Sequence, residues 1–73
     1  MAQDGTRLIE LAQFQTKVQA DLARLLLESA DIHVVLFDEG INYMLGPLMP
    51  IRLMVPEHDY MAAAEILLDE GLR

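Results

Sequence analysis

The sequence contains no cysteine, and only five of its 73 residues are lysine or arginine. Without cysteine, the chain can form neither a disulfide framework nor a thiolate zinc site. The basic residues are scattered among twelve acidic ones, and the net charge is −7. Because nucleic acids and anionic membranes are bound by clusters of Lys and Arg, we expect neither as a partner.

The sequence also lacks a long apolar run, although 53% of its residues are apolar. Its apolar runs are far shorter than the roughly 20 residues of a transmembrane helix. The first residues show no basic region followed by an apolar stretch, so we expect no signal peptide and a cytoplasmic location. A chain of 73 residues forms one domain at most, and domains this small often gain stability by oligomerising. We expect residues 1–5 to be disordered and residues 6–73 to form one α+β domain.

The hydrophobic pattern predicts five elements in the order strand, helix, strand, strand, helix. The expected strands cover about residues 7–12, 32–37 and 51–55, and the expected helices cover residues 16–30 and the stretch between Pro56 and Gly71. Thr16 and Gln19 have capping-box spacing at the start of the first helix. Pro56 ends the last strand because it lacks a backbone donor, and Gly71 is a natural helix end.

The first helix shows an apolar and a charged pattern at helical spacing. The apolar face carries Val18, Leu22, Leu25, Leu26 and Ser29, with Leu27 beside it. The charged stripe consists of Lys17, Asp21, Arg24 and Glu28. We interpret this stripe as a solvated face with i,i+3 and i,i+4 ion pairs, and a partner surface is the alternative. The apolar face of the second helix carries Tyr60, Ala64, Leu67 and Leu68.

The expected sheet has an apolar surface on both sides. Two strands separated by a helix run parallel through a right-handed crossover, which places both helices on one face of a three-stranded sheet. The second strand carries Ile32, Val34 and Leu36 on one face and His33, Val35 and Phe37 on the other. A small monomer rarely leaves an apolar patch of this kind bare. We therefore predict that the helix-free face forms an interface, with a second copy or another protein, through His33, Val35, Phe37 and Met54.

The segment from Gly40 to Pro50 is the strongest candidate for a binding loop. It is unusually apolar for a loop and contains Tyr43, Met44, Leu45, Leu48 and Met49. Loops displayed on a rigid sheet often carry binding, and Met side chains adapt to varied partners. Arg52 lies beside this segment as the one basic group available for an anion. The alternative is that the segment seals its own core or a dimer seam.

Candidate catalytic chemistry is sparse in this sequence. Glu57, His58 and Asp59 could suggest metal ligands or an acid–base pair, but adjacent residues at a helix start point in different directions, so we favour a capping and dipole role. Ser29 has no neighbouring base to activate it, and the glycines form no phosphate-binding pattern. We expect no cofactor and no enzymatic activity. A small α+β enzyme that uses His58 or His33 with a carboxylate is a further alternative.

Three stretches resemble one known family. The first is Phe14 followed by a helix that ends in Leu26-Leu27-Glu28, the second is the strand from Ile32 to Asp38-Glu39, and the third is Leu53-Met54-Val55-Pro56-Glu57-His58-Asp59 before Ala64-Glu65-Ile66-Leu67. From Leu8 to Leu68 the chain resembles a small prokaryotic family of unknown function, labelled putative signal-transducing proteins. One departure is Asp31, where the family usually has Gly.

This resemblance implies a fold related to the PII nitrogen-regulatory proteins and to ferredoxin-like α+β folds. The chain has no counterpart of the nucleotide-binding residues of PII proteins, so nucleotide binding is not implied. We therefore predict a non-enzymatic signal-transducing or protein-interaction module that forms a homodimer, with loop 40–50 as its binding element. The alternative is a sensor for a small metabolite or nucleotide that binds near this loop and Arg52.

Overall fold

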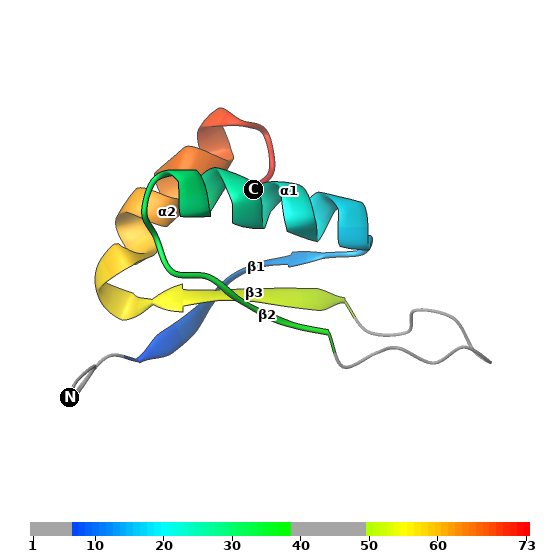
Figure 1. The fold of residues 1–73 in the computed structure, drawn as a ribbon, viewed down its shortest axis with the longest axis horizontal. Coiled ribbons are helices and arrows are strands. Elements are labelled where there is room, and N and C mark those ends of the chain that lie inside the picture. Colours follow the sequence, from blue (N-terminus) through cyan, green and yellow to red (C-terminus); the bar gives the residue numbers. More distant parts are fainter. Residues whose placement is uncertain (1–6, 39–49) are drawn as a thin grey trace.

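The computed structural model describes residues 7–38 and 50–73, which form two helices and three strands in the order β-α-β-β-α (Figure 1). The elements are β1 (Leu8–Phe14), α1 (Lys17–Ser29), β2 (Val35–Phe37), β3 (Ile51–Pro56) and α2 (Tyr60–Asp69), with a single 3-10 turn, η1 (Glu57–Asp59), before α2. The predicted order is confirmed. β1 extends to Phe14, and β2 is shorter than predicted because it begins at Val35. The first six residues lie outside the described part.

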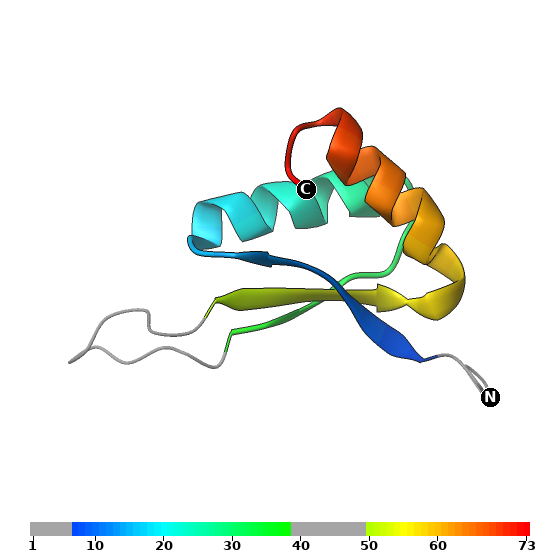
Figure 2. The same cartoon turned by 180° about the vertical axis from the view of Figure 1, so that it is seen from behind.

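The sheet has the order β1-β3-β2, and β3 is antiparallel to both of its neighbours. β1 and β2 are therefore parallel to each other without being adjacent. Both helices lie on one side of this sheet, and the views in Figures 1 and 2 show no helix on its other side. The predicted α+β architecture is confirmed, and it is consistent with a ferredoxin-like half-sandwich.

The core combines large side chains from the sheet with small ones from the helices. The buried residues on the sheet side are Leu11, Phe14, Ile32, Val34, Ile51, Leu53 and Val55, and those from the helices are Ala20, Ala23, Leu27, Ala63, Ala64 and Leu67. Four of the six helical residues are alanines, which let the helix backbones lie close to the sheet. The larger side chains of the sheet supply most of the volume of this core.

The apolar face that the sequence indicated for α1 is turned away from the core. Val18, Leu22 and Leu25 are 78%, 48% and 55% exposed, whereas Ala23 and its neighbours on the buried face have no exposed surface. At 3.6 residues per turn, the exposed and buried faces are roughly 170° apart. The prediction was wrong because the close approach of α1 to the sheet leaves room for alanine but not for a second row of leucines.

A smaller error of the same kind affects α2. Its buried face consists of Ala63, Ala64 and Leu67, and Tyr60 is half-buried against the core. Leu68, which the sequence placed on this face, is exposed. Ala63 takes its place because the helix again presents a small residue to a closely packed neighbour.

Both helices end in the same hydrogen-bonded turn. At the end of α1, the amides of Asp31 and Ile32 donate to the carbonyls of Glu28 and Leu27 at 2.9 and 3.0 Å. In α2, the amides of Gly71 and Leu72 donate to Leu68 and Leu67 at 3.1 and 2.8 Å. This is the Schellman motif, which requires a left-handed residue after the helix. Asp31 occupies that position with φ +67° and Gly71 with φ +74°, so the aspartate adopts the conformation for which glycine is preferred.

Asp31→Gly is expected to raise the free energy of unfolding by about 0.5–1 kcal/mol. Glycine enters the left-handed region without the Cβ penalty, and the change removes a negative charge from the negative end of the α1 dipole. Asp31→Ala is the matched control, since it removes the charge but keeps Cβ. Urea denaturation should rank the glycine variant above wild type and above the alanine variant. Equal stability of the glycine and alanine variants would mean that the Cβ atom does not destabilise the left-handed conformation of residue 31.

Candidate interaction surface

The helix-free side of the sheet, here called the open sheet face, is built from cross-strand rows. The register places Glu10, Met54 and Val35 in one row and Gln13, Arg52 and Phe37 in the next. Leu8 shares this side with Glu10 because the two are separated by one residue on β1. The open sheet face thus consists of Leu8, Glu10, Gln13, Val35, Phe37, Arg52 and Met54.

The predicted interface residues occupy this face unequally. Phe37 is 38% exposed, and Val35 is half-buried. Met54 was predicted to be exposed, but it is only 8% exposed. β3 is the central strand, so Met54 has a cross-strand neighbour on each side, Glu10 and Val35, at the short spacing of paired strands. The exposed apolar surface of this face therefore lies on the edge strands β1 and β2. It includes Leu8, which was not predicted from the sequence as an interface residue.

His33 lies outside the strand, in the turn between α1 and β2. Its side chain is exposed and, with Glu28, Asp31 and Ile32, it lines a shallow, open hollow at the end of α1. The predicted loop residues Tyr43, Met44, Leu45, Leu48 and Met49 lie outside the described residues.

A charged pair occupies the middle of the open sheet face. The Nε of Arg52 donates a hydrogen bond to Oε1 of Glu10 at 2.8 Å, and the Nε2 of Gln13 donates to Oε2 of the same carboxylate at 2.8 Å. The guanidinium carbon of Arg52 also lies 5.9 Å from the ring centroid of Phe37, within the range of a cation–π contact. Arg52 was predicted to be available for an anion, but it is already paired, and the centre of the face carries no net charge.

Hydrogen bonds from Arg52 and then from Gln13 lower the pKa of Glu10 below its ordinary value of 4.5. A carboxyl group with a lowered pKa in the folded state stabilises the fold above its unfolded pKa, and this contribution is lost as the pH falls through the folded value. We expect wild type to lose more stability than Glu10→Gln between pH 6 and pH 3. Parallel urea curves at several pH values measure this difference, and identical pH profiles of the two proteins would exclude it.

A β-bulge determines which residues of β1 reach this face. The register shifts between Glu10 and Ala12, so Gln13 rather than Ala12 shares the face with Glu10. The backbone carbonyl of Leu11, inside the bulge, accepts a hydrogen bond from Nε of Arg73 at 3.2 Å. Arg73 also donates to the hydroxyl of Tyr60 at 2.6 Å. Strict alternation of side chains could not have revealed this shift.

The two histidines are not part of a cluster in the described residues. His58 is exposed, and its Nε2 lies 3.4 Å from Oδ2 of the adjacent Asp59. In residues 7–38 and 50–73, no three His, Asp or Glu side chains are placed to hold a metal ion. None of the described helices is long and apolar enough to cross a membrane.

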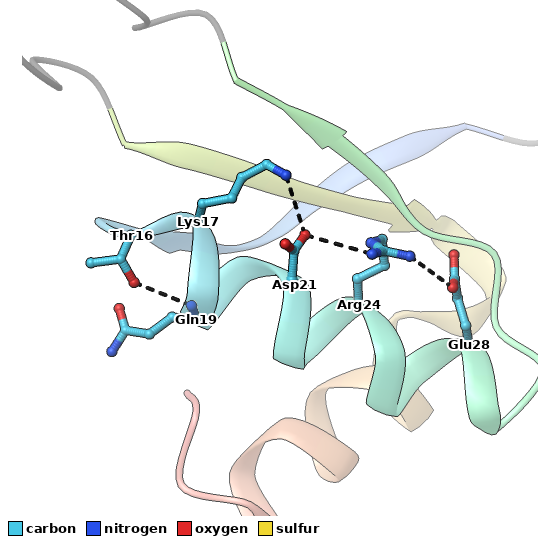
Figure 3. A network of polar contacts seen from close by, with 6 residues as sticks. All are labelled: Thr16, Lys17, Gln19, Asp21, Arg24 and Glu28. Carbon is cyan, nitrogen blue, oxygen red and sulfur yellow. Dashed lines mark hydrogen bonds and ion pairs between the residues drawn. The ribbon is translucent and has the colours of Figure 1, made fainter.

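The exposed side of α1 offers a second surface. The apolar residues Val18, Leu22 and Leu25, here called the outer face of α1, are accompanied by the charged row of Lys17, Asp21, Arg24 and Glu28. Successive members of this row form ion pairs of 3.5, 3.6 and 3.1 Å (Figure 3). The predicted i,i+3 and i,i+4 pairing is confirmed. Figure 3 also shows the predicted cap, in which the amide of Gln19 donates to Oγ1 of Thr16 at 3.1 Å.

Comparison with known protein families gives a match over residues 8–71. The matching family model is described as putative prokaryotic signal transducing protein. Its span includes all five elements of the fold. No curated protein matches the chain.

Proposed function

The chain belongs to the family of putative prokaryotic signal transducing proteins, and on this basis we propose that it is a non-enzymatic interaction module. It forms a homodimer through the open sheet face. The observation that carries this proposal is the position of Phe37 and Leu8, two large apolar side chains exposed on a sheet face that no described helix covers. Large apolar side chains left exposed on one face of a domain are typical of protein–protein contacts.

The charge distribution supports contact between two copies at this face. Each chain carries a net charge of −7, so two copies repel each other over most of their surface. At the open sheet face, the positive charge of Arg52 is balanced by Glu10 at 2.8 Å. Leu8, Val35 and Phe37 surround this neutral pair and supply the apolar area. A twofold axis through the face brings the same patch of each copy together, as in most homodimers.

We propose loop 40–50 as the element that binds a protein partner. Because Phe37 pairs with Arg52, the segment joins β2 to β3 at the end of the sheet that carries Phe37. Its candidate contacts are Tyr43, Met44, Leu45, Leu48 and Met49. An anion sensor at Arg52 would first have to break the bond to Glu10 and the contact with Phe37. For this reason we favour the interaction module over the sensor.

Light scattering coupled to size-exclusion chromatography tests the dimer. At low micromolar concentration, wild type is expected to have twice the mass of the 8.2 kDa chain, and Phe37→Asp is expected to be monomeric because a carboxylate buried in the contact would oppose it. Met61→Asp is the matched control, since Met61 is 80% exposed on α2, away from the sheet face. Wild type that is monomeric at all concentrations, or a Phe37→Asp variant that is as dimeric as wild type at low micromolar concentration, would refute the proposal.

Co-purification tests the loop separately. Replacement of Met44, Leu45 and Met49 by Ser should abolish the recovery of a partner while the mass of the chain by light scattering stays that of wild type. If the same partner is recovered with the triple variant, loop 40–50 is not the binding element.

A further inference from the structure

The outer face of α1 has the spacing of a helix–helix contact. Val18, Leu22 and Leu25 follow one another at intervals of four and three residues, and all three are large, apolar and exposed. This is the spacing by which two helices interlock their side chains. The opposite side of α1 already packs on the sheet through Ala20, Ala23 and Leu27, so the outer face is not needed for the core of the domain.

The charged row beside this face has alternating signs. From the first turn of α1 to the last, Lys17, Asp21, Arg24 and Glu28 read plus, minus, plus, minus. With two basic and two acidic residues, α1 carries no net charge, in a chain whose total is −7. Read backwards, the row becomes minus, plus, minus, plus. A second α1 running in the opposite direction therefore presents an opposite charge at every position.

We propose that the outer face of α1 docks antiparallel on α1 of a second copy, around a twofold axis that passes between residues 22 and 23. In this register, Lys17 lies opposite Glu28 of the second copy, and Asp21 lies opposite Arg24. At 1.5 Å per residue, the apolar side chains of the two copies then alternate along the contact instead of meeting head-on. In a parallel pair, the twofold axis runs along the helices and puts the two charged rows on opposite sides of the contact, where they cannot pair with each other.

The contact is small, and this determines its role. α1 has 13 residues and is about 20 Å long, so a pair of these helices buries less than the roughly 800 Å² per partner of a standard interface. Alone it associates two chains weakly. Combined with the dimer at the open sheet face, it gains from the high effective concentration of linked copies. At concentrations high enough for the weak α1 contact to form, two different twofold contacts on one chain produce assemblies of four or more chains.

Charge-reversal variants provide the test, because each variant should associate weakly with itself and more tightly with the other variant. One variant, Lys17→Glu with Arg24→Glu, makes the row entirely acidic, and the other, Asp21→Lys with Glu28→Lys, makes it entirely basic. Both are made in the full chain carrying Phe37→Asp, so that the α1 contact is measured without the sheet-face dimer. By sedimentation equilibrium, each variant alone should associate at least tenfold more weakly than Phe37→Asp. A 1:1 mixture of the two variants should associate as tightly as Phe37→Asp.

A third variant tests the apolar part of the contact. Leu22→Asn with Leu25→Asn, added to the acidic variant, should abolish recovery in the mixture with the basic variant, and circular dichroism confirms that each chain is folded. The proposal is overturned if the mixture associates no more tightly than its components, or if Phe37→Asp alone shows no association at any concentration. A failure of the sheet-face dimer is seen separately, as wild type that associates no further than Phe37→Asp.

Discussion

Ala23→Leu is expected to lower the free energy of unfolding by about 2–3 kcal/mol, whereas Leu22→Ala, one position earlier, should change it by less than about 0.5 kcal/mol. Ala23 has no exposed surface and lies where α1 meets the core. Added methylene groups at such a position force side chains off their rotamers and move the backbone. Leu22 is about half exposed, and alanine has the higher helix propensity.

Urea denaturation measures the changes in the free energy of unfolding of Ala23→Leu and Leu22→Ala. At micromolar concentration, the weak association through α1 does not interfere. Leu25→Ala serves as a second control on the exposed side and should behave like Leu22→Ala. For a domain of this size, a change of 1 kcal/mol moves the melting temperature by about 4–8 °C. Ala23→Leu should therefore melt roughly 8–24 °C below wild type. A loss of 2 kcal/mol or more in Leu22→Ala would mean that this side of α1 faces the core.

Leu53→Ala is expected to be the most destabilising single substitution, at about 3–4 kcal/mol. Leu53 has no exposed surface and lies on the central strand, with Ala12 and Leu36 as its cross-strand partners on the core side. Its truncation removes burial and leaves a cavity that strands on both sides prevent from closing. At 0.05–0.15 kcal/mol per residue, the whole domain has roughly 4–11 kcal/mol of stability, so this single substitution is expected to remove a large part of it.

Leu53→Met is the matched control for this substitution, since it conserves the side-chain volume and should lose less than about 1.5 kcal/mol. The folded fraction of both variants can be followed by far-ultraviolet circular dichroism from 5 to 60 °C. If Leu53→Ala retained a melting temperature within a few degrees of Leu53→Met, the core would not depend on the central strand as described.

The order of elements and the helix ends were accessible from the sequence because local chemistry specifies them. The hydroxyl of Thr16 caps α1 as its spacing with Gln19 predicted, and Gly71 ends α2 in the left-handed conformation. Asp31, which replaces the expected glycine, still adopts that conformation. These features depend on a few neighbouring residues, so tertiary packing does not change them.

The orientation of α1 and the burial of Met54 could not be predicted because they depend on what packs against them. A hydrophobic pattern gives most weight to large side chains, and in α1 the large residues Val18, Leu22 and Leu25 point outward while alanines face the sheet. Similarly, the alternation of side chains along a strand predicts an exposed Met54, because this pattern treats each strand alone. Its burial follows from the position of β3 between two strands, which no local pattern contains.

The strand order also has a consequence for how the chain folds as it is synthesised. Among the strands that the structure describes, β1 and β2 pair only with β3, and β3 begins at Ile51. A nascent chain that ends before this strand holds two strands that have no hydrogen-bonded partner, together with one helix of 13 residues, a length that is marginal in isolation. The ribosome must therefore release β3 before any part of the sheet can form. We expect the domain to fold in a single step, and only after β3 has emerged.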